Sequence, residues 1–198
     1  MQQIVIASNN PGKIQEFQDI FSGYGIEIIP QSRLMVSEID EPYATFVENS
    51  LHKARHCSLI SGLPSLADDS GLCVNALNGA PGIHSARYAG TPKSDTANTL
   101  KLLNELCSIK QRQAYFYCSL VFVRHAADPQ PIIAEGIFKG EIATSPLGSG
   151  GHGYDPIFWL SKHQATVAQL EAKFKNQISH RGLALTELIT KLKHAGLF

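Results

Sequence analysis

The chain lacks several features that would point to particular classes of protein. It has four cysteines in 198 residues, and none of them forms a C-x-x-C pair, so neither a zinc site nor a disulfide framework is expected. Its eight histidines include one H-x-x-x-H pair, His52 and His56, but no H-E-x-x-H arrangement, which argues against a zinc hydrolase. There is no apolar run of membrane-spanning length and no signal peptide, so we expect a cytoplasmic protein without a membrane partner.

The chain also has no excess of charge of either sign. Lys and Arg together number 17, as do Asp and Glu, which gives a formal net charge of zero. Affinity for duplex nucleic acid comes mainly from many cationic side chains that neutralise phosphates, so no nucleic-acid partner is expected. Any recognition of phosphate should therefore be local. A hydrophobic content of 43% is ordinary for a globular protein, and residues 1–198 suit one domain, with one core or two lobes that share a sheet.

Hydrophobic periodicity predicts interleaved helices and strands, hence an α/β fold with a mixed sheet. The strands are expected at 3–7, 27–30, 65–69, 72–77, 114–124, 132–143 (bent at Gly136 or Gly140) and 157–160. The helices are expected at about 12–22, 46–61, 95–107 (with Leu100, Leu103 and Leu106 on one face), 166–174 and 181–195. The helix at 46–61 has the clearest limits, because Thr45 and Glu48 form a capping box and Gly62 follows its end.

The first candidate site is the polar turn Ser-Asn-Asn-Pro-Gly-Lys at residues 8–13, between the first strand and the first helix. Backbone N–H groups at a helix N-terminus, small polar side chains and one lysine suit an anion such as phosphate. The segment is not a P-loop, because the upstream glycine is missing and Ile14 stands where Ser or Thr would hold magnesium. The alternative is an ordinary Asn-Pro-Gly turn beside a surface lysine.

A second candidate is the glycine-rich loop Gly148–Gly153, which matches G-x-G-x-x-G. A dinucleotide site is excluded, because a helix should follow directly and Pro156 stands there instead. The loop is expected to be flexible or to contain positive φ angles, so that backbone can approach a flat ligand. His152 and Tyr154 offer ring faces to a base, although buried packing is the commoner position of tyrosine.

Acidic residues form a third candidate. Asp68 and Asp69 are adjacent at the expected end of a strand, so their side chains should point to opposite faces. A carboxylate there suits magnesium and can orient water, whereas a turn-forming aspartate is the alternative. Glu38, Asp40 and Glu41 cluster in a loop, where they either complete a metal site or remain solvated.

Cationic residues on two helices complete the candidates. Lys53 lies about 100° around the 46–61 helix from the expected apolar stripe, so it either reaches a cleft or faces water. Ser179 is expected to cap the last helix, with His180 and Arg181 in its first turn. An arginine there opposes the helix dipole, an inconsistency that a bound anion would explain.

The motifs, in chain order, are S-N-N-P-G-K (8–13), T-F-V-E-N (45–49), A-D-D-S-G-L (67–72), G-A-P-G-I-H-S-A-R-Y (79–88), G-Y-D-P-I-F (153–158) and S-H-R-G (179–182). In this order they resemble the inosine triphosphate pyrophosphatase family, which includes the bacterial dITP/XTP pyrophosphatases, over nearly the whole chain. Each motif alone is weak, but their order is specific. The resemblance implies an elongated two-lobed α/β fold with a long mixed central sheet flanked by helices, a deep inter-lobe cleft and a homodimer.

What the resemblance implies about activity is a Mg²⁺-dependent hydrolase of non-standard purine nucleoside triphosphates (ITP, dITP, XTP). The products would be the nucleoside monophosphate and pyrophosphate, which keeps these bases out of DNA and RNA. The resemblance also implies that Asp69 is the catalytic carboxylate and, with Glu41, a metal ligand. It implies substrate contacts from Ser8, Asn9, Asn10, Pro11, Gly12, Lys13, Lys53, Ser70, His152, Gly153, Tyr154, Asp155, Lys175, His180 and Arg181.

The chain departs from the family pattern in two places. His152 precedes Gly153 where the family commonly has Phe or Trp, and Pro42-Tyr43 follows Glu41 where the family often has Thr-Gly. Two other interpretations stay open. One is a related pyrophosphatase that acts on modified pyrimidine triphosphates, and the other is a nucleotide-binding regulator that has lost turnover.

Overall fold

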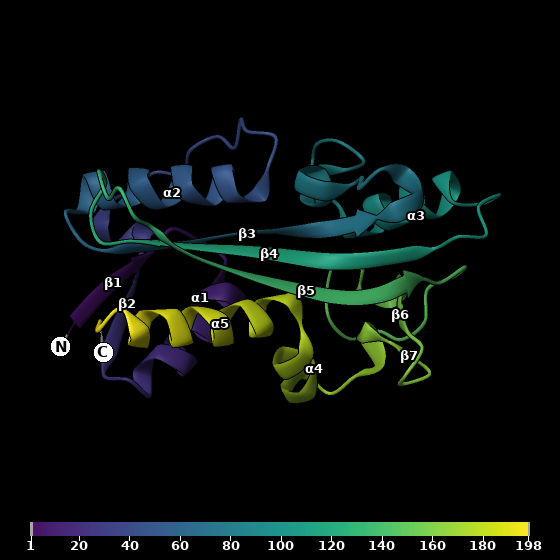
Figure 1. The fold of residues 1–198 in the computed structure, drawn as a ribbon. Helices are drawn as coiled ribbons and strands as arrows, with labels where there is room; N and C mark the ends of the chain where they lie inside the picture. Colours follow the sequence, from purple (N-terminus) through teal and green to yellow (C-terminus); the bar gives the residue numbers. More distant parts are fainter. Residues whose placement is uncertain (1, 198) are drawn as a thin grey trace. The chain divides into compact units, whose positions relative to one another are not determined.

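The computed structural model describes residues 2–197, which contain a seven-stranded mixed sheet of order β2-β1-β3-β4-β5-β6-β7 (Figure 1). The strands are β1 (Gln2–Ile6), β2 (Ile26–Pro30), β3 (Ser65–Val74), β4 (Gln113–Val123), β5 (Ile132–Ile142), β6 (Phe158–Leu160) and β7 (Ala165–Thr166). The helices are α1 (Pro11–Ser22), α2 (Phe46–Ser61), α3 (Asp95–Glu105), α4 (Ala172–Ile178) and α5 (His180–His194). The prediction of an α/β fold around a mixed sheet is confirmed.

The chain divides into two compact units. The first comprises Met1–Asp69, Ser119–Glu135 and Leu185–Phe198, and the second comprises Ser70–Cys118 and Gly136–Ala184. No helix in the described part of the chain is long and apolar enough to cross a membrane.

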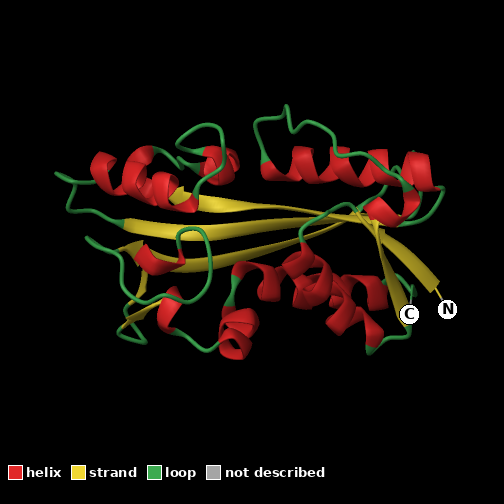
Figure 2. Ribbon diagram, turned by 180° about the vertical axis from the view of Figure 1, so that it is seen from behind, coloured by secondary structure: helices red, strands yellow, loops and turns green. Residues whose placement is uncertain are grey.

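In the first unit, β1 lies between β2 and β3 and is parallel to both. Helix α2 covers one face of this part of the sheet, and α1 with the C-terminal part of α5 covers the other (Figures 1 and 2). β-Branched and small residues fill the core between sheet and α2, among them Val5, Ala54, Ala67 and Val121. Because these side chains are short, α2 can pack close to the strands, which matters for the lysine it carries.

The helices of the first unit begin where the sequence predicts. Asn10 caps α1 by accepting a hydrogen bond from the Lys13 amide at 3.2 Å, and Pro11 occupies the first helical position. Thr45 caps α2 by accepting from the Glu48 amide at 3.3 Å, and Gly62 ends it in the left-handed conformation at φ +69°.

In the second unit, β5, β6 and β7 pair antiparallel in sequence order. Helix α3 packs against the core through Leu102 and Leu106, whereas Leu100 is 54% exposed. The predicted face is confirmed for Leu103 and Leu106, which pack against the core, and wrong for Leu100. Leu102 contributes to the buried stripe instead, because it lies one helical turn before Leu106.

Two other element predictions were wrong. Residues 65–69 and 72–77 do not form two strands, because β3 runs unbroken from Ser65 to Val74 and residues Asn75–Leu77 form a 3-10 turn. The prediction ended the first strand in the polar Asp-Asp-Ser-Gly run, but the two carboxylates have ion-pair partners and stay within one strand. The predicted helix at 166–174 is replaced by β7, a 3-10 turn at Val167–Gln169 and α4, which starts at Ala172.

Gly136, a predicted bend, is required for close packing. A Cβ atom there would lie 1.9 Å from the carbonyl oxygen of His180 and 2.7 Å from the amide nitrogen of Ala184. The first turns of α5 therefore lie directly on β5, and only a residue without a side chain allows that approach.

Candidate active site

The turn at residues 8–13 forms the N-terminus of α1 as predicted. The side chain of Asn10 caps the helix, and the backbone N–H of Asn10 donates to Ser8 Oγ at 3.2 Å. Asn9 donates from Nδ2 to Glu38 Oε1 at 2.9 Å, which ties the turn to the acidic loop. Capping fixes the turn, and Lys13, the last residue of the turn, has a side chain that is 24% exposed. The arrangement fits an anion cradle in which Asn10 organises the backbone.

Asp68 and Asp69 lie within β3, not at a strand end as predicted, and they point to opposite faces as predicted. Asp68 forms an ion pair with Lys13 of α1, and its carboxylate is fully buried. Asp69 faces α2, where its Oδ1 lies 3.8 Å from Lys53 Nζ. Because α1 and α2 cover opposite faces of the sheet, the alternation of one strand delivers one carboxylate to each helix.

On the face of the sheet that α2 covers, Lys53 lies between Glu41 and Asp69. Its Nζ lies 2.6 Å from Glu41 Oε1 and donates to the backbone oxygen of Asp68 at 2.7 Å. The side chain is 15% exposed, so it neither faces water freely nor belongs to the apolar core. Of the two predicted alternatives, the one in which Lys53 simply faces water is therefore wrong.

Lys53, Asp69 and Glu41 are mostly buried charged groups that interact with one another. Burial raises the pKa of Asp69 to about 6; Lys53 opposes this, whereas the neighbouring carboxylates of Glu41 and Asp68 add to it. For Lys53, burial acts to lower the pKa, but the carboxylates of Asp69 and Glu41 outweigh it and the pKa is raised. The carboxylates are thus in excess on the α2 side, and a further cation would be favourable there.

The donor set fits Mg²⁺. Both Asp69 and Glu41 lie within 4 Å of the same point, Lys53 Nζ, so their oxygens can converge on one cation. Within residues 2–197 no three His, Cys, Asp or Glu side chains are grouped as a ready-made metal site. Mg²⁺ is commonly held by one or two carboxylates, with waters and substrate phosphates as the other ligands, so two suffice.

Asp155 organises the loop that precedes it in the second unit. Its Oδ2 accepts from the His152 amide at 2.8 Å and from Lys175 Nζ at 2.5 Å. Gly151 and Gly153 have φ angles of +73° and +61°, which confirms the predicted positive φ angles. A Cβ atom at Gly151 would lie 2.1 Å from Asp155 Oδ2, so the glycine lets this carboxylate reach the loop backbone.

The two rings of this loop differ in exposure. His152 is exposed, whereas Tyr154 is buried and donates from its hydroxyl to the Ser85 oxygen at 2.9 Å. Tyr154 is therefore packed in the interior, which is the commoner position of tyrosine, and burial raises the pKa of its hydroxyl. Of the two rings, only His152 presents itself to a ligand from solvent.

The start of α5 confirms the predicted cap. Ser179 Oγ accepts from the Gly182 amide at 3.1 Å, which places His180 and Arg181 in the first turn. The His180 ring stacks on Phe116, with centroids 5.0 Å apart and planes at 16°, and Arg181 is buried. Ser70 follows Asp69 on β3 and is half-buried.

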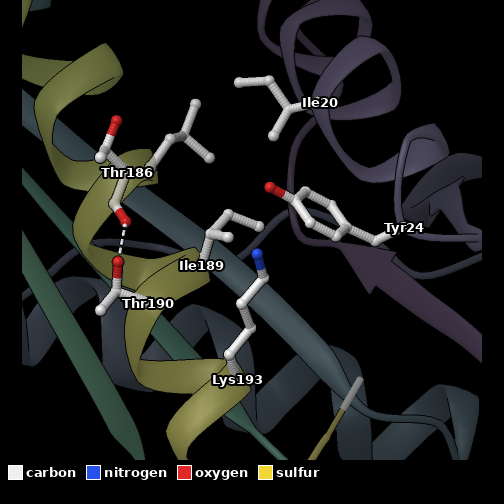
Figure 3. Close-up of a pocket in the computed structure, with 7 residues that line it drawn as sticks. Ile20, Tyr24, Thr186, Ile189, Thr190 and Lys193 are labelled. Carbon is white, nitrogen blue, oxygen red and sulfur yellow. Dashed lines mark hydrogen bonds between the residues drawn. The ribbon is translucent and has the colours of Figure 1, made fainter.

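A pocket of about 330 Å³ lies elsewhere in the first unit, between α1 and α5 (Figure 3). Tyr24 and Lys193 flank it, with Lys193 Nζ 4.7 Å from the Tyr24 ring centroid. Its lining is Ile20, Tyr24, Leu185, Thr186, Ile189, Thr190 and Lys193, none of which belongs to the predicted site.

Sequence reasoning left Asp68 outside the predicted site, although the structure pairs it with Lys13. The signal was present in the alternation of the strand, which places Asp68 on the face opposite Asp69. It was missed because no sequence pattern shows that α1 covers that face.

Comparison with known proteins gives the family. A model of the Ham1 family matches residues 4–191. The chain belongs to the Ham1 family. It is 56% identical over 192 residues to the dITP/XTP pyrophosphatase of Neisseria meningitidis serogroup B, covering 96% of each chain. It is 56% identical over 193 residues to the dITP/XTP pyrophosphatase of Burkholderia pseudomallei, covering 96% of this chain and 93% of the other.

Solved structures give the same result for the fold. A HAM1 protein from Coxiella burnetii superposes with a TM-score of 0.95 at 45% identity, covering 98% of this chain and all (100%) of the other. A nucleoside-triphosphatase, dITP/XTP pyrophosphatase, from Mycobacterium abscessus superposes with a TM-score of 0.81 at 38% identity, covering 96% and 100%. The resemblance drawn from the sequence motifs is thereby confirmed.

Proposed function

We propose that this Ham1-family protein is a pyrophosphatase of non-standard purine nucleoside triphosphates. It would convert dITP, XTP and ITP to the nucleoside monophosphate and pyrophosphate, and so clear them from the pool used for DNA and RNA synthesis. The observation that carries the proposal is that β3 places two charged groups on its two faces: Asp68 with Lys13, and Asp69 with Lys53 and Glu41. The relatives named above support it, since they are dITP/XTP pyrophosphatases.

In this proposal, residues 8–13, Lys53 and Arg181 bind the phosphates. The capped N-terminus of α1 offers backbone N–H groups to an anion, and Lys13 stands in its first turn. Lys13 and Lys53 are held by carboxylates, which position both ammonium groups for a triphosphate. They would then stabilise the negative charge that develops on the leaving pyrophosphate.

Asp69 and Glu41 would hold Mg²⁺. When bound, the ion would neutralise phosphate charge and polarise the phosphorus–oxygen bonds. Asp69 has a pKa of about 6 because it is buried, so at neutral pH it is mostly ionised and can accept a proton from the attacking water. Hydrolysis of the α–β anhydride adds the water oxygen to one product, and the displaced oxygen leaves on the other.

The second unit would recognise the base and sugar through Ser70, the 152–155 segment, Lys175 and His180. Lys175 is held by Asp155 at 2.5 Å, and an ammonium group can only donate hydrogen bonds. It therefore suits the 6-keto oxygen of hypoxanthine or xanthine and not the 6-amino group of adenine. Sites built on such pairing can discriminate by several powers of ten. The exposed ring of His152 would stack on the base.

The remaining parts of the proposal are a homodimer, a cytoplasmic location, and no nucleic-acid or membrane partner. Zero formal net charge supports the absence of a nucleic-acid partner, and the family resemblance supports the dimer. Light scattering on the purified protein would establish the oligomeric state.

The deciding experiment is pyrophosphate release with Mg²⁺ across ITP, dITP, XTP, ATP, GTP and dUTP. We expect kcat/KM for the first three to exceed that for ATP and GTP by at least about a hundredfold. Preference for dUTP or methylated pyrimidine triphosphates would replace this proposal with a pyrimidine-directed enzyme. Binding of ITP without release of pyrophosphate would point to a nucleotide-binding regulator.

A further inference from the structure

A hydrogen bond joins the loop around His152 to a helix far away in the sequence. The backbone N–H of Gly153 donates to Asp95 Oδ2 at 2.7 Å, across 58 residues. Asp95 is the first residue of α3, and Thr99, one turn further on, places its hydroxyl 3.5 Å from the Gly153 oxygen. Both backbone groups of Gly153 thus face the same helix.

The loop needs such an anchor. Gly148, Gly151 and Gly153 all have positive φ angles, and residues 147–152 are exposed. Glycine has more conformational freedom to lose than any other residue, so each ordered glycine in an exposed loop carries an entropic cost. A hydrogen bond from the N–H of Gly153, the last glycine before the buried Tyr154, to a carboxylate limits the freedom of the preceding residue, His152.

Asp95 is itself fixed in place. Ser94 caps α3 by accepting from the Ala97 amide at 3.2 Å. Asn98 is buried and binds the 86–89 segment through two hydrogen bonds, from the Ala89 amide at 2.7 Å and to the Ala86 oxygen at 3.2 Å. The first turn of α3 is therefore held at both its cap and its inner face. Its dipole also favours a negative charge at Asp95.

We propose that Asp95 is a positioning residue for base recognition: it holds Gly153, and through it His152, in the arrangement that receives the purine. This inference rests on the proposed function, in which His152 stacks on the base. Asp95 touches neither phosphates nor metal in this scheme, so it should affect affinity for the nucleotide and leave the chemical step alone.

The test compares Asp95→Ala, Asp95→Asn and the control Thr96→Ala, which removes an exposed side chain from the same helical turn. We expect Asp95→Ala to raise KM for ITP about tenfold, as for the loss of one charge-assisted hydrogen bond, with kcat changed less than about twofold. Asp95→Asn keeps an acceptor oxygen and should restore most of the loss. Thr96→Ala should match the wild type.

Inorganic tripolyphosphate separates the base from the phosphates. It should inhibit wild type and Asp95→Ala equally, because it has no base to position. An unchanged KM in Asp95→Ala, a fall in kcat alone, or an equal weakening of tripolyphosphate would each overturn the inference. If the wild type releases no pyrophosphate, the proposed function fails, and calorimetric binding of ITP then decides about Asp95: equal affinity in wild type and Asp95→Ala, or no binding, overturns the inference. Asp95→Asn covers the case in which the alanine variant does not fold.

Discussion

Lys53 Nζ lies 2.6 Å from Glu41 Oε1, so this lysine is paired with a carboxylate that is proposed to bind metal. The two roles are compatible if Mg²⁺ and nucleotide bind together. Magnesium would then take the carboxylates while Lys53 turns to a phosphate. The pairing of Lys53 with Glu41 thus holds charges of both signs together at the proposed site.

Lys53 should be important for stability as well as for activity. Lys53→Met leaves Glu41 and Asp69 close together without their cation. We expect the free energy of unfolding, measured by urea titration, to fall by about 2 kcal/mol. In the double variant Lys53→Met/Asp69→Asn one of the two charges is gone, so part of that loss should be recovered. Additive effects in the double-mutant cycle would contradict the electrostatic coupling.

Asp69→Asn should abolish pyrophosphate release and keep the fold. The carboxylate is buried beside Glu41 and Asp68, which disfavours its ionised form, so the neutral amide should not lower the melting temperature without Mg²⁺. Asp19→Asn, on the exposed side of α1, is the matched control and should retain full activity. Pyrophosphate release near the wild-type rate by Asp69→Asn would remove Asp69 from its catalytic role.

Addition of Mg²⁺ should stabilise the protein through Asp69 and Glu41. A ligand that binds only the folded state raises its stability by RT ln(1 + [L]/Kd), so the melting temperature should rise with Mg²⁺ concentration. Glu41→Gln should shift this dependence to about tenfold higher Mg²⁺, because one charged ligand is lost. If the Glu41→Gln curve overlays that of the wild type, Glu41 is not a ligand, and the Pro42-Tyr43 departure from the family pattern becomes significant.

Acid should weaken the protein through Asp128, which lies outside the site. Hydrogen bonds from Arg124 hold the pKa of Asp128 well below its usual range, and the carboxylate is buried. A lowered pKa in the folded state means that this contribution is complete above the unfolded pKa of about 4 and is lost as pH falls below it.

Asp128→Asn should therefore cost about 1.5 kcal/mol of unfolding free energy at neutral pH, a value reduced by the solvent exposure of Arg124. The difference between the two proteins should shrink below about pH 4. Denaturant titrations at several pH values measure it. A difference that stays constant down to pH 2 would show that the pairing with Arg124 does not depend on charge.

Much of the fold followed from local signals. The limits of α1 and α2 were predictable because capping is a local interaction. The side chains of Asn10 and Thr45 accept hydrogen bonds from amides three residues later, and Gly62, which has no side chain, ends α2 in the left-handed conformation. The 166–174 segment failed for the opposite reason: its apolar residues, among them Val167 and Ala168, are buried by neighbours distant in the sequence, so helical spacing was coincidental.

The candidate site was predicted in its members more than in its geometry. The motifs suggested Lys13 and Asp69, the helix position and the family resemblance suggested Lys53, and the structure brings Lys53 and Asp69 together with Glu41. The partner of Asp68 and the anchor of Gly153 were not predictable, because each is a contact between segments more than fifty residues apart. Periodicity reports which face of an element is apolar, not what covers it.

Because β3 is unbroken, its successive side chains alternate between the two faces of the sheet. Asp68 serves the helix on one face and Asp69 the helix on the other only because they are consecutive residues of one strand. Insertion or deletion of a single residue in β3 before Asp68 would exchange the faces of the two carboxylates and separate each from its lysine. Variation in length should therefore be tolerated in exposed loops and not between Ser65 and Asp69.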